Sequence, residues 1–267
     1  MKKYLITFAD SRYSFARLKK QAEMMNYFDS VDIFTEKNLD KDFKQKHKSI
    51  LKLGSRGYGY WIWKPYIIHK MLQKMNAGDF LLYIDAGCHL NPVGRERLIE
   101  YFDLVTQSEL KIGGFQIEEC HNEKRWSKMD LLVHLGVENN KSLLESGQIC
   151  ATHVILQKCE KSEAFVKNWL KISENYHYID DSPSIHTEPK SFRGHRHDQS
   201  IFSIMCKLEG AVQFSGDEVY PRDGVSWELL QPYPIHDRRD RSFTFIGKLM
   251  DGIIRLKKKI SHFVQGM

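Results

Sequence analysis

A run of five apolar or aromatic residues, Phe80-Leu81-Leu82-Tyr83-Ile84, constrains the fold of this chain more than any other stretch. A strand without polar residues on either face is typical of a sheet that helices cover on both sides. The run ends at Asp85, and the small residues Ala86 and Gly87 follow. Ligands of open α/β sheets bind at the carboxyl ends of strands. Asp85 is therefore a candidate ligand of a metal ion or a sugar hydroxyl, and the alternative is that it only caps the next turn.

The first fifty residues predict a strand, a helix, a second strand and a second helix. Apolar runs at 3–9 and 31–35 are the strands, a helix follows Ser14 as its N-cap, and a lysine-rich helix spans 39–53. Further patterns predict strands at 111–117, 149–156, 211–214 and 218–221, and helices at 92–106 and 165–172. This order favours a doubly wound, mostly parallel sheet.

Residues 54–65 have the most unusual composition, with three glycines and four aromatic residues before Pro65. Proline suits the first turn of a helix, and a helix N-terminus beside Lys64 is a candidate anion site. Trp61 and Trp63 offer stacking faces for a ligand, although they would equally well fill the core between helix and sheet.

Composition narrows the class of protein. With 267 residues, of which 42% are hydrophobic, the chain has enough apolar surface for one large domain. Its net charge of +6 suits anionic partners, including nucleotides, nucleic acid and membranes. The five cysteines form no Cys-x-x-Cys pair, so neither a disulfide framework nor a zinc knuckle is predicted, and we expect a cytoplasmic protein.

Three further segments carry candidate site residues. Glu118 follows the strand at 111–117, and Ser146-Gly147-Gln148 leads into the next one. Residues 176–196 predict a long irregular loop, typical of a binding loop, that delivers His197-Asp198-Gln199 to the start of a helix. At a helix start, Asp198 could also serve only the cap and the helix dipole.

The end of the chain is basic. His236 and Arg238 lie in a proline-rich segment that suits a diphosphate and its metal. Residues 243–263 combine an apolar stripe with lysines and arginines, which predicts an amphipathic helix on the inner face of a membrane, or one packed on its own domain. We therefore divide the chain into a domain at 1–242 and a helix at 243–267.

Together these motifs resemble the GT-A fold glycosyltransferases that bacteria use to build capsule or lipopolysaccharide O-antigen. The resemblance covers residues 3–240 and is strongest at 57–65 and at Tyr83-Ile84-Asp85-Ala86-Gly87. It implies a Rossmann-like, mostly parallel sheet flanked by helices. It also implies transfer of a sugar from a nucleotide-diphosphate donor, with a UDP-sugar favoured, to a hydroxyl of a saccharide or a lipid-linked saccharide.

The same resemblance assigns roles to residues. Ala9, Asp10 and Arg12 map to the nucleotide site, and Asp85-Ala86-Gly87 maps to the Asp-x-Asp motif that holds Mn²⁺ or Mg²⁺ on the donor diphosphate. Because Gly87 replaces the second acid, two options stay open: Asp85 and His236 hold the metal, or Lys64 and Arg238 neutralise the diphosphate.

Asp198 and Gln199 map to the catalytic centre, where they would bind the donor sugar or lie near its anomeric carbon, and Gly147 and Gln148 map to the nucleotide-sugar site. Glu118 is the candidate base if the enzyme inverts. The motif order favours retention of configuration. Two other classes remain open: a nucleic-acid-binding protein, suggested by basic and aromatic residues at 56–64, and a metal-dependent hydrolase or nucleotidyltransferase that uses Asp85 and Asp198.

Overall fold

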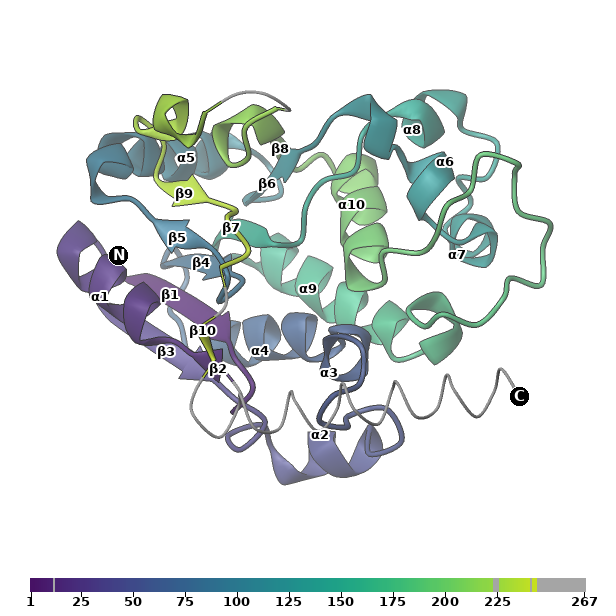
Figure 1. Ribbon diagram of the computed structural model, residues 1–267, viewed down its shortest axis with the longest axis horizontal. Coiled ribbons are helices and arrows are strands. Elements are labelled where there is room, and N and C mark those ends of the chain that lie inside the picture. Colours follow the sequence, from purple (N-terminus) through teal and green to yellow (C-terminus); the bar gives the residue numbers. More distant parts are fainter. Residues whose placement is uncertain (12, 223–225, 241, 244–267) are drawn as a thin grey trace.

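A six-stranded sheet with the order β3-β1-β4-β7-β6-β8 forms the centre of the computed structural model, which describes residues 1–11, 13–222, 226–240 and 242–243 (Figure 1). Its strands are β1 Lys3–Phe8, β3 Ser30–Phe34, β4 Phe80–Ile84, β6 Ile112–Gln116, β7 His153–Gln157 and β8 Val212–Ser215. Two small ladders accompany it, β2 Tyr13–Ser14 with β10 Ser242–Phe243, and β5 His89–Leu90 with β9 Ile235–His236.

The sheet is mixed, with more parallel than antiparallel pairs. β1 pairs in parallel with β3 and β4, and β6 with β8, whereas β7 is antiparallel to both β4 and β6. The reason lies in the segment between β6 and β7. Ile117 donates its backbone N–H to Gln148 O, and Gln116 bridges to Ile149, so the chain re-enters the sheet at the end where it left. A strand that re-enters at that end has to run in the opposite direction.

Helices cover both faces of the sheet, as predicted. The helices are α1 Ala16–Met25, α2 Lys41–Lys46, α3 Gly57–Tyr60, α4 Trp63–Leu72, α5 Arg95–Gln107, α6 Glu123–Trp126, α7 Met129–His134, α8 Lys141–Glu145, α9 Glu160–Ser173 and α10 Asp198–Glu209. One apolar core lies between the sheet and α4, α9 and α10, and a second lies between the sheet and α1 and α5 (Figure 1). All five residues of β4 are buried. The prediction that helices cover this strand on both faces is therefore confirmed.

Some predicted elements are shorter than expected, or absent. In the lysine-rich segment at 39–53 only Lys41–Lys46 are helical, and the C-cap His47 is buried, with its Nδ1 2.8 Å from the hydroxyl of Tyr176. The predicted strand at 218–221 is wrong, since Gly216–Glu218 form a 3₁₀ turn instead. Ser14 is not the N-cap of α1; Phe15 takes that position.

Arg12 and the predicted amphipathic helix at 243–263 lie outside the described residues, apart from Phe243 in β10. Among the helices that the structure does describe, none has the length and apolar character needed to cross a lipid bilayer.

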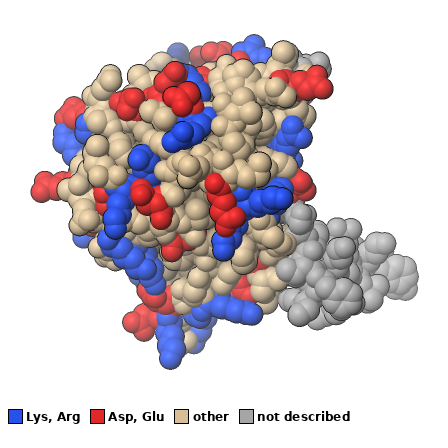
Figure 2. Space-filling model, turned by 90° about the vertical axis from the view of Figure 1, so that its left-hand side faces the viewer, with Lys and Arg blue, Asp and Glu red and all other residues tan. Residues whose placement is uncertain are grey.

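Figure 2 shows acidic and basic side chains interspersed on one face of the molecule.

Candidate active site

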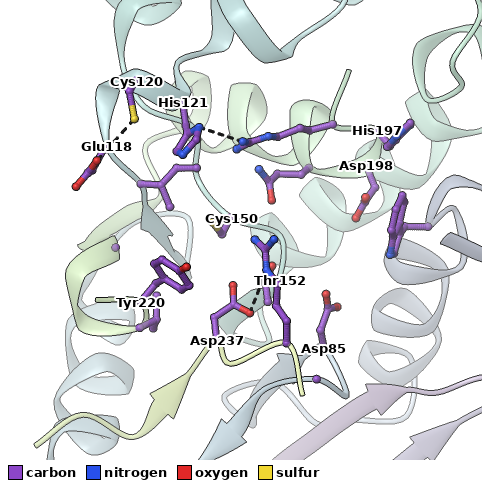
Figure 3. Close-up of a pocket in the computed structure, with 18 of the residues that line it drawn as sticks. Asp85, Glu118, Cys120, His121, Cys150, Thr152, His197, Asp198, Tyr220 and Asp237 are labelled. Carbon is purple, nitrogen blue, oxygen red and sulfur yellow. Dashed lines mark hydrogen bonds and ion pairs between the residues drawn. The ribbon is translucent and has the colours of Figure 1, made fainter. Parts of the chain in front are cut away.

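A cavity of 720 Å³ opens beyond the carboxyl end of β4. Its lining comes from segments that are far apart in sequence and that the sheet brings together: the turn before α4, the turn after β4, the segment after β6, the loop before α10, and residues 216–239. Figure 3 shows Asp85 and Asp198 at one side of this cavity and Glu118 and Cys120 at the other. The site therefore lies where the α/β fold predicts a ligand.

Lys64 is the centre of the charged groups. It lies in the first turn of α4, its side chain is only 4% exposed, and its Nζ donates to the carbonyl of Ala151 at 3.0 Å. The same Nζ is 3.4 Å from Asp85 Oδ1 and 3.1 Å from Asp198 Oδ2. Burial acts to lower the pKa of Lys64, but the two carboxylates outweigh it and the pKa is raised. Lys64 therefore stays charged and holds both acids at the cavity.

The two acids differ in environment. Asp85 is 27% exposed and accepts a hydrogen bond from the hydroxyl of Tyr83. Asp198 is 4% exposed, and burial raises its pKa to about 6, against the opposing attraction of Lys64. An acid whose pKa is raised by burial at the wall of a cavity is typical of a functional site. Asp198 is the first residue of α10 and at the same time lies at the cavity wall.

Two strained segments position these residues. Five consecutive residues, Gly57 to Trp61, have positive φ, so α3 is a left-handed turn. His197, directly before Asp198, also has a positive φ of 56°. The rings of Tyr60 and Trp61 pack against the His197 ring, with centroids 5.2 and 5.3 Å apart. Strain of this kind persists only where surrounding contacts hold it, and here the two strained segments hold each other.

Trp61 and Trp63 have different surroundings. Trp63 stacks on Phe8 in the core, with ring centroids 3.9 Å apart, as the packing alternative predicted. Trp61 lines the cavity, although its ring also packs on His197 and lies against Gly57.

Six of the predicted site residues line the cavity together: Lys64, Asp85, Gly87, Glu118, Asp198 and Gln199. Ala9 and Asp10 follow β1, next to β4, but neither lines the cavity, and Ala86 contributes its carbonyl to Arg17. Gly147 lines an adjoining cavity of 400 Å³ that shares Glu118 with the first. A Cβ at Gly147 would come within 1.8 Å of the Ile117 oxygen, so this position requires glycine.

Gln148 is fully buried and does not line the cavity. Its amide nitrogen donates to Glu123, Ser127 and Ser200 at 3.0 to 3.2 Å. Its carbonyl oxygen accepts a hydrogen bond from Gln199 at 2.9 Å. Gln148 therefore orients Gln199 rather than contacting a ligand, which corrects its predicted place in the donor site.

In the segment after β9, the cavity is lined by the sequence neighbours of the two residues that we predicted. His236 Nε2 is 2.8 Å from the carbonyl of Leu230, and Arg238 lies over the ring of Trp227, so neither lines the cavity. Asp237 and Arg239 line it instead. The chain turns here, since the Arg238 N–H donates to His236 O at 2.9 Å and Arg239 has a positive φ of 52°, and this turn brings the neighbours of the two predicted residues to the cavity.

The predicted metal pair, Asp85 and His236, does not fit a Mn²⁺ or Mg²⁺ site. The His236 ring is held against Leu230, and Asp85 Oδ1 is engaged by Tyr83 and Lys64. Gly87 cannot be replaced by a second acid without movement, because a Cβ there would be 3.2 Å from the backbone of Arg239.

Arg196 is a cavity residue that the sequence interpretation missed. Its guanidinium lies 4.3 Å from the centre of the Trp126 ring, and one nitrogen is 3.1 Å from His121 Nδ1. Burial lowers its pKa, and the nearby positive charge of Arg239 lowers it further. Two guanidinium groups of like charge at one cavity wall suit an anionic ligand. The available signal was its position two residues before Asp198.

One solved structure with a similar fold is a glycosyltransferase. The bifunctional glycosyltransferase WbbM superposes with a TM-score of 0.51 at 8% identity over 91% of this chain and 46% of the WbbM chain, so this chain spans under half of WbbM. This likeness confirms the predicted GT-A type fold.

Two weaker matches cover nearly the whole of their own chains. Mouse xyloside xylosyltransferase 1 matches with a TM-score of 0.44 at 12% identity, over 88% of this chain and 97% of that one. A glycosyltransferase involved in glycosylation of the major capsid of PBCV-1 matches with a TM-score of 0.47 at 9% identity, over 88% and 94%. No protein-family model and no curated protein matches the sequence.

Proposed function

We propose that this chain is a glycosyltransferase of bacterial surface polysaccharide synthesis, which moves a sugar from a nucleotide-diphosphate donor, a UDP-sugar being favoured, to a hydroxyl of a saccharide or lipid-linked saccharide at the cytoplasmic face. One observation carries the proposal. Lys64 holds Asp85 and Asp198 together at the carboxyl edge of a GT-A type sheet, at the wall of a 720 Å³ cavity. Pockets for small ligands measure about 300 to 1,000 Å³, so a nucleotide sugar fits.

The donor diphosphate is assigned to the basic side of this cavity. Arg196 and Arg239 lie close enough for the charge of one to affect the other, and Lys64, in the first turn of α4, lines the same cavity. Guanidinium groups bind phosphate oxygens through paired hydrogen bonds, and a bound diphosphate would relieve the repulsion between them. No step of this proposal depends on a divalent ion at Asp85.

Asp198 and Gln199 are assigned to the donor sugar. In a retaining transfer, the bond between the anomeric carbon and the diphosphate oxygen breaks, and its electron pair leaves with the diphosphate. The acceptor oxygen bonds to the anomeric carbon from the same face and gives its proton to the departing diphosphate. Above pH 6 the Asp198 carboxylate is charged and would stabilise the positive charge that develops on the sugar.

The acceptor is assigned to the adjoining cavity of 400 Å³, with Glu118 at the junction of the two. Glu118 is 51% exposed and lies 3.4 Å from Arg222. It is the candidate base for the alternative, inverting mechanism, in which the acceptor attacks from the opposite face.

Calorimetry with UDP, GDP and CMP tests the proposal, because a nucleotide-sugar enzyme binds its own diphosphate product selectively. We expect Arg239→Gln to weaken binding of the preferred nucleotide by about tenfold, as expected for one lost charged hydrogen bond. Arg238→Gln is the matched control, since Arg238 lies over Trp227 and outside the cavity. If no nucleotide binds, or if both variants weaken binding equally, the assignment is wrong.

A further inference from the structure

Cys88, His153 and Asp237 come together next to the turn that carries Asp85 and Gly87. Cys88 closes this turn by donating its backbone N–H to Asp85 O, His153 begins β7, and Asp237 follows β9. One ligand atom from each, a thiol sulfur, an imidazole nitrogen and a carboxylate oxygen, lies within 4.8 Å of the other two. All three residues are buried.

His153 is the most informative of the three. It is fully buried, and neither of its ring nitrogens has a hydrogen-bond partner among the residues that the structure describes. Its ring meets Phe115 edge to face, with centroids 5.4 Å apart. A buried polar group without a partner costs roughly 1 to 3 kcal/mol, and leaving a nitrogen unpaired in the core requires a compensation. A metal ion supplies one, because it takes the nitrogen lone pair.

We propose that Cys88, His153 and Asp237 bind one Zn²⁺ ion. Thiolate, imidazole and carboxylate are all zinc ligands, and a thiolate disfavours Mg²⁺ and Mn²⁺, which prefer oxygen. With bonds of about 2.0 to 2.3 Å, tetrahedral ligands lie about 3.5 Å apart. Since the three atoms lie within 4.8 Å of one another, they need to approach by about 1.3 Å at most. The fourth position is left for a water molecule or for a ligand atom from the cavity, which Asp237 lines.

The ion would tie together three segments that position the cavity residues: the turn after β4, the start of β7 and the segment after β9. It is distinct from the predicted Mn²⁺ or Mg²⁺ pair, with which it shares no residue. The ligands come from three distant segments of the chain, so the spacing of the cysteines could not reveal the site. The thiol of Cys88 and the imidazole of His153 meet only in the folded protein.

Metal content and cobalt spectroscopy test this inference without an activity assay. The full-length protein is incubated with excess Zn²⁺, dialysed, and analysed by plasma mass spectrometry, and we expect about one zinc per chain. Replacement by Co²⁺ should produce the near-ultraviolet absorption of a thiolate–cobalt bond. Cys88→Ser should abolish that band, whereas Cys206→Ser, which removes an equally buried thiol from α10, should leave it unchanged.

A second variant keeps the test decisive if Cys88→Ser does not fold. His153→Leu should lower zinc content at least tenfold and lower the melting temperature of the zinc-loaded protein. If the imidazole is only an unpaired core group, the same variant should be neutral or stabilising. Wild-type protein that retains no zinc after dialysis and shows no thiolate–cobalt band would overturn the inference.

Discussion

Replacing Lys64 with methionine tests the electrostatics of the proposed site most directly. The substitution keeps much of the side-chain volume but removes the only charge that lies between Asp85 and Asp198 in the described structure. It also leaves the Ala151 carbonyl without its lysine donor. Asp198 is only 4% exposed, whereas Asp85 is 27% exposed. Once the lysine is gone, water can therefore hydrate Asp85 more readily than Asp198.

The size of the effect follows from the pKa of Asp198. Burial has already raised this pKa from 3.8 to about 6, so in the wild-type protein stability falls as the pH rises through this window. Removing one partner of a buried ion pair costs roughly 3 to 5 kcal/mol if the other stays charged. About 3 kcal/mol corresponds to roughly two pH units. Asp198 in Lys64→Met should therefore keep its proton up to about pH 8.

The cost of the substitution should then depend on pH. Near pH 5 Asp198 is largely neutral in both proteins, whereas at pH 8 the wild-type protein keeps the attraction of Lys64 and the variant does not. We expect the difference in unfolding free energy to grow by about 2 kcal/mol between pH 5 and pH 8. Urea denaturation at both pH values, followed by tryptophan fluorescence, measures it. Donor turnover at pH 8 should fall by about 100-fold or more.

Lys158→Met is the matched control. Lys158 Nζ also donates to backbone carbonyls, those of Leu72 and Met75, but its carboxylate neighbour Glu163 is 3.6 Å away and 34% exposed. The loss of unfolding free energy caused by Lys158→Met should be the same at pH 5 and pH 8. A cost of Lys64→Met that is also independent of pH would show that Lys64 does not determine the protonation of Asp198, and normal turnover would remove Lys64 from the site.

Three further predictions follow from the structure and the sequence. Asp85→Asn should lower transfer by about 100-fold with little change in circular dichroism; near-normal turnover would contradict its role. Gly59→Ala should destabilise the protein by about 1 kcal/mol more than Gly210→Ala, because both have positive φ but only at Gly59 would the Cβ meet the Leu51 side chain at 2.9 Å and the Ile50 backbone oxygen at 3.3 Å; equal melting temperatures would refute this. Removal of residues 244–267 should reduce sedimentation with anionic vesicles at low salt, and unchanged sedimentation would exclude an anchor.

Elements that depend on local pattern were predictable from the sequence. The apolar run before Asp85 is the buried strand β4, and the apolar spacing after Asp198 is the helix α10. Elements that depend on distant contacts were not. The helix predicted at 39–53 ends at Lys46, and the next residue, His47, contacts Tyr176, which is far along the chain and which no pattern within the segment reveals.

The candidate site shows the same limit. Asp85, Lys64 and Asp198 were each identified from the ends of predicted elements, and the fold brings them together. After β9 the structure places Asp237 and Arg239 at the cavity instead of His236 and Arg238, because the chain turns there, and no pattern in this proline-rich segment predicts the turn. The structure selects Asp237 over His236 there.

The left-handed turn at Gly57–Trp61 explains why that segment has such an unusual composition. Its two glycines adopt positive φ without penalty, but each of its three aromatic residues costs about 1 to 2 kcal/mol in this conformation. The turn is held by Gly57 O, which accepts a hydrogen bond from the Trp63 ring at 2.8 Å, and by the packing of Tyr60 and Trp61 on His197. Because α4 begins directly after the turn and α10 directly after His197, these contacts fix the amino-terminal ends of both helices relative to each other. The strained conformation thus determines the separation of Lys64 and Asp198, on which the proposed chemistry depends.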